Sequence, residues 1–455
     1  MKGSKIKKTV AVIATLLACL MLFSCGFDGG TVELTHKKKT ADPDAGDTDP
    51  ETEGGRADLK VGAIMVGDDS EGYTLAHKDG INAAVKAIKK KTGKNVSVVW
   101  KERVEETVDC VTAAESLIAG GATLIVSNSY GHQEYMKTVA DKYANIQFVA
   151  IGGDFAAICG SKNLHNAYTN IYEARYVSGV VAGMKLAELV RNGEIKAENM
   201  DGENIKVGYV GAFPYAEVVS GYTAFYLGMK SVVENITMEV VYTQYWFSES
   251  LEGEAARYLM SRGCVIIGQH ADSTGAPAAV QAARQAGTYT NVYSVGYNVD
   301  MLTAAPDVAL TSAANNWEVY YEELFTLALE GKDIPTDRSK GYADNAVSIT
   351  PLGKACAAGT QEKVDATIKA IKDGSLKVFD TSKFTVGGER ITDAKVDLSY
   401  MDFSGSAPKV VYQGETKNAL VAENGITYFS ESTLRAAPYF QLRIDGIIEN
   451  TLKFN

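Results

Sequence analysis

Histidine and cysteine are scarce in this chain of 455 residues, which has five of the first and six of the second. No two histidines have the H-E-x-x-H spacing, and no two cysteines have the C-x-x-C spacing, that zinc sites commonly use. The segment "HQE" (132–134) begins like the H-x-E of zinc deaminases, but no P-C-x-x-C follows it. These absences argue against a metal enzyme, and the sequence predicts no cofactor.

Motifs for nucleophilic and dinucleotide-dependent catalysis are missing as well. The chain has no G-x-S-x-G nucleophile elbow, and no G-x-G-x-x-G opens a helix after a predicted strand. We therefore predict that the protein is not an enzyme. A secreted enzyme that cleaves nucleosides is the weakest alternative, because it needs a general acid–base pair that the sequence does not identify.

An excess of positive charge is also absent. The formal net charge is −11, and without the four lysines of the first eight residues, 41 basic side chains stand against 56 acidic ones. Nucleic-acid binding depends on basic patches, so no nucleic-acid partner is expected.

The N-terminus has the pattern of an export signal. Lysines precede the apolar run "TVAVIATLLACLMLF" (9–23), which is too short to span a membrane comfortably. The run ends in "LFSC", which resembles a bacterial lipoprotein box with Cys25 as the lipidated, mature N-terminus. The alternatives are an ordinary secretory signal with an incidental cysteine, or a box that ends at Cys19. We predict a signal peptide over 1–24.

Residues 25–58 are rich in Gly, Asp, Thr and Glu and have no apolar periodicity. Such a segment cannot bury a core, so we predict a flexible tether behind the lipid anchor. The protein is then expected at the cell membrane, lipid-anchored and facing the extracytoplasmic side.

From about residue 60, short β-branched runs alternate with amphipathic helical stretches, which predicts parallel βαβ units. Two sets of similar size predict an α/β fold with two doubly wound parallel sheets, one in each of two lobes, plus a small β-rich C-terminal extension. The predicted ranges are 59–175 for lobe I, with 300–335 returning to it, 176–299 for lobe II, 336–384 for a helical segment that completes the lobes, and 385–455 for the extension. Disulfides among Cys110, Cys159, Cys264 and Cys356 are left open.

The loop "VGDDSEGYT" (66–74) follows the first predicted strand and nearly matches a phosphate-binding loop. Tyr73 stands where that loop needs a lysine, and Asp68, Asp69 and Glu71 would repel phosphate. Ligands of open parallel sheets bind beyond the carboxyl ends of the strands. We therefore expect this loop to face a cleft between the lobes and to hold a ligand other than a nucleoside triphosphate.

Other predicted strand ends repeat the same mixture of aromatic, carboxylate and amide side chains. Aromatic faces stack on flat rings, carboxylates accept hydrogen bonds from vicinal hydroxyls, and Asn amides pair with a base edge. The mixture suits a neutral ring that bears a hydroxylated sugar, although core packing is the alternative for any single aromatic. The predicted ligand-binding residues are Asp69, Ser70, Tyr73, Ser129, Glu134, Trp246, Asp272, Asn298, Asn316 and Trp317.

At these residues the chain resembles the basic membrane protein family. These are lipid-anchored solute-binding proteins of ABC importers, related to the purine nucleoside receptor lipoproteins. The resemblance runs from about Lys60 to Asp380 and is carried by stretches such as "YEARYVSGVVAGM" and "AFPYAEV". It implies a two-lobed type I periplasmic-binding fold with three hinge crossovers, a small-molecule ligand, and ABC permease and ATPase subunits as partners.

The resemblance also implies roles for single residues. Tyr73 and Trp246 fall on ring-stacking aromatics, Glu134 on a sugar-binding carboxylate, and Asn298 on a base- or sugar-facing acid. The family's first-loop aspartate falls on Ser70, and a lysine that nucleoside-binding relatives place near 315–316 is missing. These departures leave open whether the ligand is a purine nucleoside, a free base or a related ring.

We therefore predict a membrane-anchored receptor that closes two lobes over a purine-like solute and delivers it to a permease. The alternative from another class is a sensor that presents its closed lobes to a signalling partner.

Overall fold

The computed structural model describes residues 57–402 and 409–450. The predicted signal peptide, Cys25, and the predicted tether apart from its last two residues lie outside the described residues. In the part of the chain that is described, no helix is both long and apolar enough to cross a membrane.

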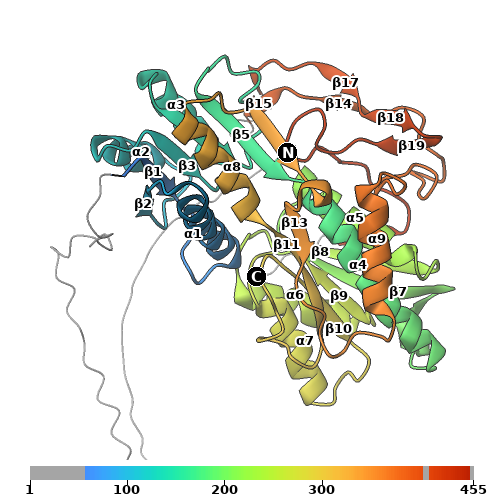
Figure 1. The fold of residues 1–455 in the computed structure, drawn as a ribbon. Coiled ribbons are helices and arrows are strands. Elements are labelled where there is room, and N and C mark those ends of the chain that lie inside the picture. The colour runs from blue at the N-terminus through green and yellow to red at the C-terminus, as the bar shows by residue number, and fades with distance from the viewer. Residues whose placement is uncertain (1–56, 403–408, 451–455) are drawn as a thin grey trace, which may run out of the picture. The chain divides into compact units, whose positions relative to one another are not determined.

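The first lobe is built on a six-stranded sheet in the order β12-β5-β4-β3-β1-β2, and every neighbouring pair in it is parallel. The short apolar runs of β3 and β4 are buried almost throughout, as expected of parallel strands with helices on both faces. Helices α1 and α8 pack side by side in this lobe (Figure 1). The bounds are β1 Leu59–Ile64, α1 Gly72–Thr92, β2 Val96–Lys101, α2 Asp109–Ala119, β3 Leu124–Ser127, α3 His132–Lys142, β4 Gln147–Ile151, β5 Leu164–Thr169, α8 Trp317–Glu330 and β12 Asp337–Lys340.

The second lobe is built on the sheet β13-β11-β10-β9-β7-β8-β20, with β6 paired to β7. Its strands run parallel except for β13 and β6. The bounds are α4 Ile171–Arg191, η1 Ala197–Asn199, β6 Met200–Asp201, β7 Asn204–Gly211, α5 Ala216–Lys230, β8 Ile236–Tyr242, α6 Glu249–Ser261, β9 Ile266–Gln269, α7 Gly275–Gln285, β10 Tyr293–Tyr297, β11 Ala309–Asn315, η2 Tyr342–Asp344, β13 Val347–Ile349, α9 Thr360–Lys372 and β20 Ile447–Asn450.

Helices α4 and α5 are largely buried, and they pack on each other at two glycines. A Cβ on Gly179 would lie 2.1 Å from the carbonyl oxygen of Phe225, and one on Gly228 would lie 2.0 Å from that of Tyr176. The small residues that the sequence places on α4 therefore allow the two helix backbones to approach closely. This pair lies beside α9 (Figure 1).

The predicted α/β fold with two parallel sheets is confirmed, but several predicted lobe ranges are wrong. Strand β11 pairs with β10 in the second sheet, so the chain returns to the first lobe only after Asn315, not from residue 300. Helix α4 begins at Ile171 and packs on α5, so the second lobe starts at about residue 171, a few residues earlier than the predicted start at 176. The segment 336–384 is not simply helical, because it supplies β12 to one sheet and β13 to the other.

The chain crosses between the lobes after β5, after β11 and between β12 and β13, which agrees with the three crossovers that the resemblance implies. Hydrogen bonds join the crossing strands. Thr169 donates to Oδ1 of Asn315 at 2.5 Å, and Ser339 donates to Oδ1 of Asn170 at 2.5 Å. The lobes are thus held together where they are hinged.

The predicted C-terminal extension is β-rich, as expected, but it is not a separate module. Its last strand, β20, forms the edge of the second sheet by pairing with β8. Tyr400 and Tyr412 pack on Phe155 of the first lobe, and Arg435 forms an ion pair with Asp154 at 3.0 Å. The extension therefore contacts both lobes. Its short antiparallel strands are β14 Lys395–Asp397, β15 Tyr400–Asp402, β16 Lys409–Tyr412, β17 Thr416–Asn418, β18 Leu420–Glu423 and β19 Ile426–Phe429.

Candidate functional site

The order of the strands marks one place in each sheet where a ligand is expected. In the first sheet β1 lies between β2 and β3, and in the second β7 lies between β8 and β9, so the chain order reverses direction at β1 and at β7. Open α/β sheets bind ligands at the carboxyl ends of the strands beside such a reversal. The relevant segments are 65–74 and 128–131 in the first lobe, and 212–217 and 270–274 in the second.

In the first lobe, a polar network fixes the loop after β1. The backbone N–H of Val66 donates to Oδ1 of Asn128 at 2.8 Å, and Nδ2 of Asn128 donates to Oγ1 of Thr74 at 3.2 Å. Thr74 in turn donates to Glu71 at 2.5 Å. Burial raises the pKa of Glu71 despite this hydrogen bond. The network holds the first turn of α1, and with it Tyr73, at the end of the sheet.

Trp317 lies behind Tyr73 in the core of the first lobe. Its ring stacks on His77 with centroids 4.1 Å apart, and His77 meets the ring of Tyr73 edge-on at 4.6 Å. Trp317 is 1 % exposed and packs within the core, and its predicted ligand contact remains a prediction. His77 also hydrogen bonds to the hydroxyl of Tyr321 at 2.8 Å. Tyr73 therefore packs on His77, which in turn packs on Trp317.

In the second lobe, Glu217 and His270 lie at the centre of the site. Neither belongs to the predicted ligand-binding set, although His270 directly follows a predicted strand. Glu217 lies in the first turn of α5, the position after β7 that Tyr73 occupies after β1. Its Oε1 accepts a hydrogen bond from Nε2 of His270 at 3.2 Å and a second from the hydroxyl of Tyr168. Equivalence to Tyr73 in the second βαβ unit is the signal that would have identified Glu217.

His270 is held as a neutral donor. Nε2 faces a carboxylate oxygen of Glu217, which can only accept, so the proton of the neutral ring sits on Nε2; the hydroxyl of Tyr209 lies 3.5 Å from Nδ1. Burial and then the positive charge of Arg175 lower the pKa of His270 to about 4. Burial opposes ionisation of Glu217, but the hydrogen bonds from His270 and Tyr168 and the nearby Arg175 outweigh it, and the pKa of Glu217 is lowered. Glu217 is therefore an ionised carboxylate at neutral pH.

Arg175, on α4, supplies a positive charge that balances the negative charge of Glu217. Its side chain is 1 % exposed, its Nη1 donates to the carbonyl oxygen of Gln269 at 2.6 Å, and its guanidinium lies 3.5 Å from the ring centre of Tyr297. Within the described residues, its Nε and Nη2 have no hydrogen-bond partner. A buried, partly unpaired arginine stabilises anionic neighbours in the same lobe.

Asp272 and Asn298 join the loops after β9 and β10. Asn298 donates from Nδ2 to Oδ1 of Asp272 at 2.6 Å and accepts at Oδ1 from Nδ2 of Asn315 at 3.3 Å. Burial, followed by the nearby carboxylates of Glu71, Glu252 and Glu217, raises the pKa of Asp272 well above its usual range. Both predicted residues thus belong to one buried polar network at the strand ends.

An aromatic group of the second lobe borders this network. The half-buried ring of Trp246 lies 5.4 Å from Phe213, 6.2 Å from Tyr215 and 6.4 Å from His270, measured between ring centres. Phe213 and Tyr215 stack on each other at 5.1 Å, and Tyr215 is 55 % exposed. The backbone oxygen of Trp246 accepts from the N–H of Asp272 at 2.8 Å, which ties the aromatic loop to the acid.

The two lobes meet at this place. A Cβ on Gly72, next to Tyr73, would lie 3.3 Å from both the carbonyl oxygen of Asp272 and a methyl carbon of Val299. Burial, then the charges of Glu217 and of Tyr297, raises the pKa of Tyr73 well above its usual range. The first turn of α1, which carries Tyr73, therefore contacts the loops of the second lobe that carry Asp272 and Val299.

The remaining predicted residues make contacts within the chain. Asp69 is exposed and pairs with Lys78, and Ser70 donates to Asp68 from both its N–H and its hydroxyl. Ser129 donates to Glu106, Glu134 accepts from Tyr400 of the C-terminal extension at 2.7 Å, and Asn316 bonds to Asn345 and Ser348. Their predicted ligand contacts remain predictions.

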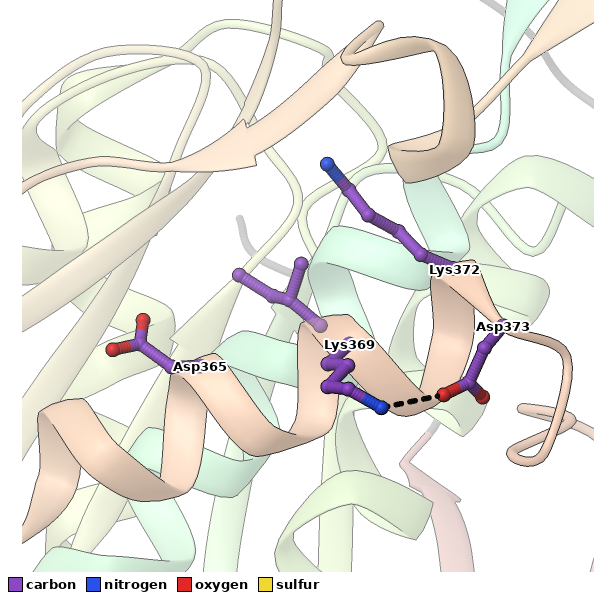
Figure 2. Close-up of a pocket in the computed structure, with 5 residues that line it drawn as sticks. Asp365, Lys369, Lys372 and Asp373 are labelled. Atoms are coloured by element: carbon purple, nitrogen blue, oxygen red, sulfur yellow. Dashed lines mark hydrogen bonds and ion pairs between the residues drawn. The ribbon is translucent and has the colours of Figure 1, made fainter.

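A hollow of about 380 Å³ lies elsewhere, on the surface of α9. Figure 2 shows Asp365, Lys369, Lys372 and Asp373 along this helix, with Lys369 paired to Asp373 at 3.1 Å. The spacing of these charges is that of the solvated face of an amphipathic helix. The hollow does not contain any of the predicted site residues.

The four cysteines of the described residues are free thiols, and Cys110 and Cys264 are buried. Burial raises the pKa of the Cys110 thiol to about 12, so it is protonated and unreactive at neutral pH. The question of disulfides that the sequence leaves open is thus answered for this structure.

Comparison with known proteins agrees with this architecture. The family described as "ABC transporter substrate-binding protein PnrA-like" (Bmp) matches residues 61–375. A purine-binding protein of Brucella abortus is 29 % identical over 343 residues, which cover 74 % of this chain and 89 % of that protein.

Two solved structures have the same fold. A solute-binding protein of Aeropyrum pernix K1 aligns with a TM-score of 0.56 at 14 % identity, over 70 % of this chain and 93 % of its own. One from Conexibacter woesei aligns with a TM-score of 0.51 at 20 % identity, over 70 % and 98 %. The matched family consists of binding proteins, which confirms the prediction that the protein is not an enzyme. This chain belongs to the family of PnrA-like substrate-binding proteins of ABC transporters.

Proposed function

We propose that this substrate-binding protein is a lipid-anchored receptor that binds a purine base or nucleoside between its lobes and delivers it to the permease of an ABC importer. The observation that carries the proposal is the contact between the lobes at the first turn of α1, where Gly72, next to Tyr73, lies against Asp272 and Val299 of the opposite lobe. The 29 % identity to a protein named as purine-binding supports the choice of ligand class.

The side chains at this junction have the chemistry that a purine needs. Tyr73 and Trp246 supply aromatic faces, each stack being worth about 1–3 kcal/mol per base. Asn298 and Asn315 carry amides that both donate and accept, and Glu217 accepts. Movement of the lobes about the crossovers at 169–171 and 315–317 would admit the ring and then exclude water from it. Each hydrogen bond made inside then replaces one made to water, so the geometry must be good.

The anchor is proposed from the sequence alone. Cys25 ends a lipoprotein-like box, and about 30 residues of polar tether separate it from β1. A receptor on such a tether stays close to a permease in the same membrane. Metabolic labelling with a fatty acid, with Cys25→Ala as the negative control, tests this part of the proposal.

The ligand is best identified from the protein itself. The chain from residue 58 onward is purified and denatured, and any released small molecule is identified by mass spectrometry. A purine base or nucleoside supports the proposal. A chain that releases nothing and gives no heat with a panel of purines and nucleosides in calorimetry contradicts it and leaves the family membership untouched.

A further inference from the structure

In the part of the chain that the structure describes, one oxygen of the Glu217 carboxylate accepts hydrogen bonds from the protein and the other accepts none. Oε1 accepts from both Tyr168 and His270, which fills its two lone-pair positions. In the described residues, no hydrogen bond reaches Oε2, and about a quarter of the side chain is exposed (26 %). The two donors fix the carboxylate plane, so Oε2 is a pre-oriented acceptor.

Three aromatic side chains border this oxygen's surroundings. Tyr168 donates to this carboxylate, and the ring of Tyr297 lies 5.1 Å from that of His270, the second donor, between ring centres. Trp246 approaches His270, the donor on the opposite side, to 6.4 Å between ring centres. The carboxylate of Glu217 therefore lies in an aromatic environment of the kind that suits a flat ring.

The protein keeps Glu217 as an acceptor instead of a donor. The Nε2–H of His270 donates to it at 3.2 Å, and the buried Arg175 favours its ionised form. An ionised carboxylate has no proton to give, so it repels the lone pair of a carbonyl oxygen or of an unprotonated ring nitrogen. Such an unmatched contact is costly at a water-excluded site.

We propose that Glu217 is a specificity-determining ligand contact: its Oε2 accepts a hydrogen bond from an N–H of the bound ring and selects rings that donate at that edge. The class of ligand is a purine-type base or nucleoside with an exocyclic amine or a ring N–H. This inference rests on the proposed function, because it concerns the same junction between the lobes. Neither the family model nor the sequence pattern assigns a role to this residue.

The test compares ligands that differ only in the donor. Adenosine and guanosine carry base N–H donors, whereas purine riboside and 6-methoxypurine riboside carry none. We expect the wild-type chain to bind the better of the first two at least about tenfold more tightly than either of the others, because hydrogen bonds to charged groups contribute about 1.5–3 kcal/mol. The pair 9-methyladenine and 9-methylpurine makes the same comparison for a site that takes only free bases.

The variant Glu217→Gln keeps the size of the side chain but places an N–H₂ where an acceptor was. It is expected to lose about tenfold or more in affinity for the donor-bearing ligand and little or nothing for 6-methoxypurine riboside, so that the preference narrows or inverts. Glu318→Gln is the matched control, since Glu318 is an exposed acid in the first turn of α8, and it is expected to change neither value. Thermal unfolding of both variants checks that the fold is retained.

Three other outcomes overturn the inference. In the first, the wild type binds donor-bearing and donor-free nucleosides equally. In the second, Glu217→Gln, still folded, keeps the wild-type preference. Either leaves the receptor function intact. If no purine binds, the proposed function is wrong, and the inference about Glu217 is then tested with whatever solute the denatured protein releases. A solute without an N–H donor, or one that Glu217→Gln retains as well as the wild type does, overturns the inference separately.

Discussion

Asn298 donates a hydrogen bond to Asp272 at 2.6 Å, and the acceptor is a buried carboxyl whose pKa is raised well above its usual range. Asn298 itself adopts a left-handed backbone conformation with φ of 62°, which asparagine tolerates better than most residues. The amide therefore serves two purposes. It permits the turn after β10, and it supplies a neutral donor to an acid that already has three carboxylates nearby.

Replacing this amide by an acid tests how much of the site depends on it. Asn298→Asp keeps the shape but puts a second carboxyl against Asp272, whose pKa is already raised, so the pair holds its proton more tightly than Asp272 does alone. That proton is retained only in the folded chain, so stability is lost as pH rises above the ordinary carboxyl pKa of about 4. We expect a lower melting temperature than wild type, with a larger gap at pH 8 than at pH 5.

The control is Asn424→Asp, at an exposed asparagine with φ of 51° in the turn between β18 and β19. It has the same backbone requirement without the buried acid, so its melting temperature should stay close to wild type at both pH values. Equal gaps at pH 8 and pH 5 for Asn298→Asp would contradict the close pairing with Asp272.

Aromatic stacking makes a second prediction, which concerns affinity. Tyr73→Ala and Trp246→Ala should each weaken binding of the identified ligand by about tenfold or more, because each removes a face worth about 1–3 kcal/mol. Calorimetric titration measures the change. Tyr289→Ala is the control, because Tyr289 precedes β10 and so lies at the opposite end of the sheet. Wild-type affinity in both site variants would place the ligand elsewhere.

The sequence predicted the two parallel sheets because their strands are continuous apolar runs separated by helices. It missed β5, "LHNAYT", because His165 and Asn166 interrupt the apolar pattern although both are buried. It missed the pairing of β20 with β8, which joins segments some 200 residues apart and leaves no local signal. Local periodicity identifies elements, but the edges of sheets are decided by tertiary contacts.

The sequence predicted only some residues of the candidate site, because local patterns show which residues follow strands but not which distant residues meet. Asp272 and Asn298 follow strands, so position alone indicated them, and the structure brings them together. Glu134 also follows a strand, but it faces Tyr400, more than 260 residues later, and the sequence gives no sign of that contact. Glu217 and Arg175 lie on helices, where charged residues are common and give no sign of a site. Only the topology of the sheet shows that these helices bring them to His270.

The neutral state of His270 is directly measurable. Because its pKa in the folded chain, about 4, lies below that of an unfolded histidine, its contribution to stability is complete above pH 6.5 and is lost as pH falls from 6.5 to 4. In NMR spectra of labelled histidines, the His270 signal should not titrate between pH 8 and pH 5.5. His270→Asn assigns the signal by its disappearance. A titration midpoint near 6.5 would mean that the ring is charged at mildly acidic pH and does not hold Glu217 as described.

The last prediction concerns the chain beyond the matched family range, which ends at residue 375, because Phe379, Phe429 and Phe440 belong to the core of the second lobe. Phe440 is fully buried, stacks on Phe379 at 4.4 Å and meets Phe429 at 4.8 Å. Phe440→Ala should therefore lower the free energy of unfolding by about 3–5 kcal/mol, as measured by denaturant titration. The control, Ile448→Ala, alters a residue of β20 that is 46 % exposed and should cost less than about 1 kcal/mol.

If both variants unfold like the wild type, the extension packs on the lobes without contributing to their stability, and a chain that ends at residue 375 should then unfold at the wild-type temperature. We expect that shortened chain to be strongly destabilised, because it loses the edge strand of the second sheet and also the contacts of Tyr400 and Arg435 with the first lobe.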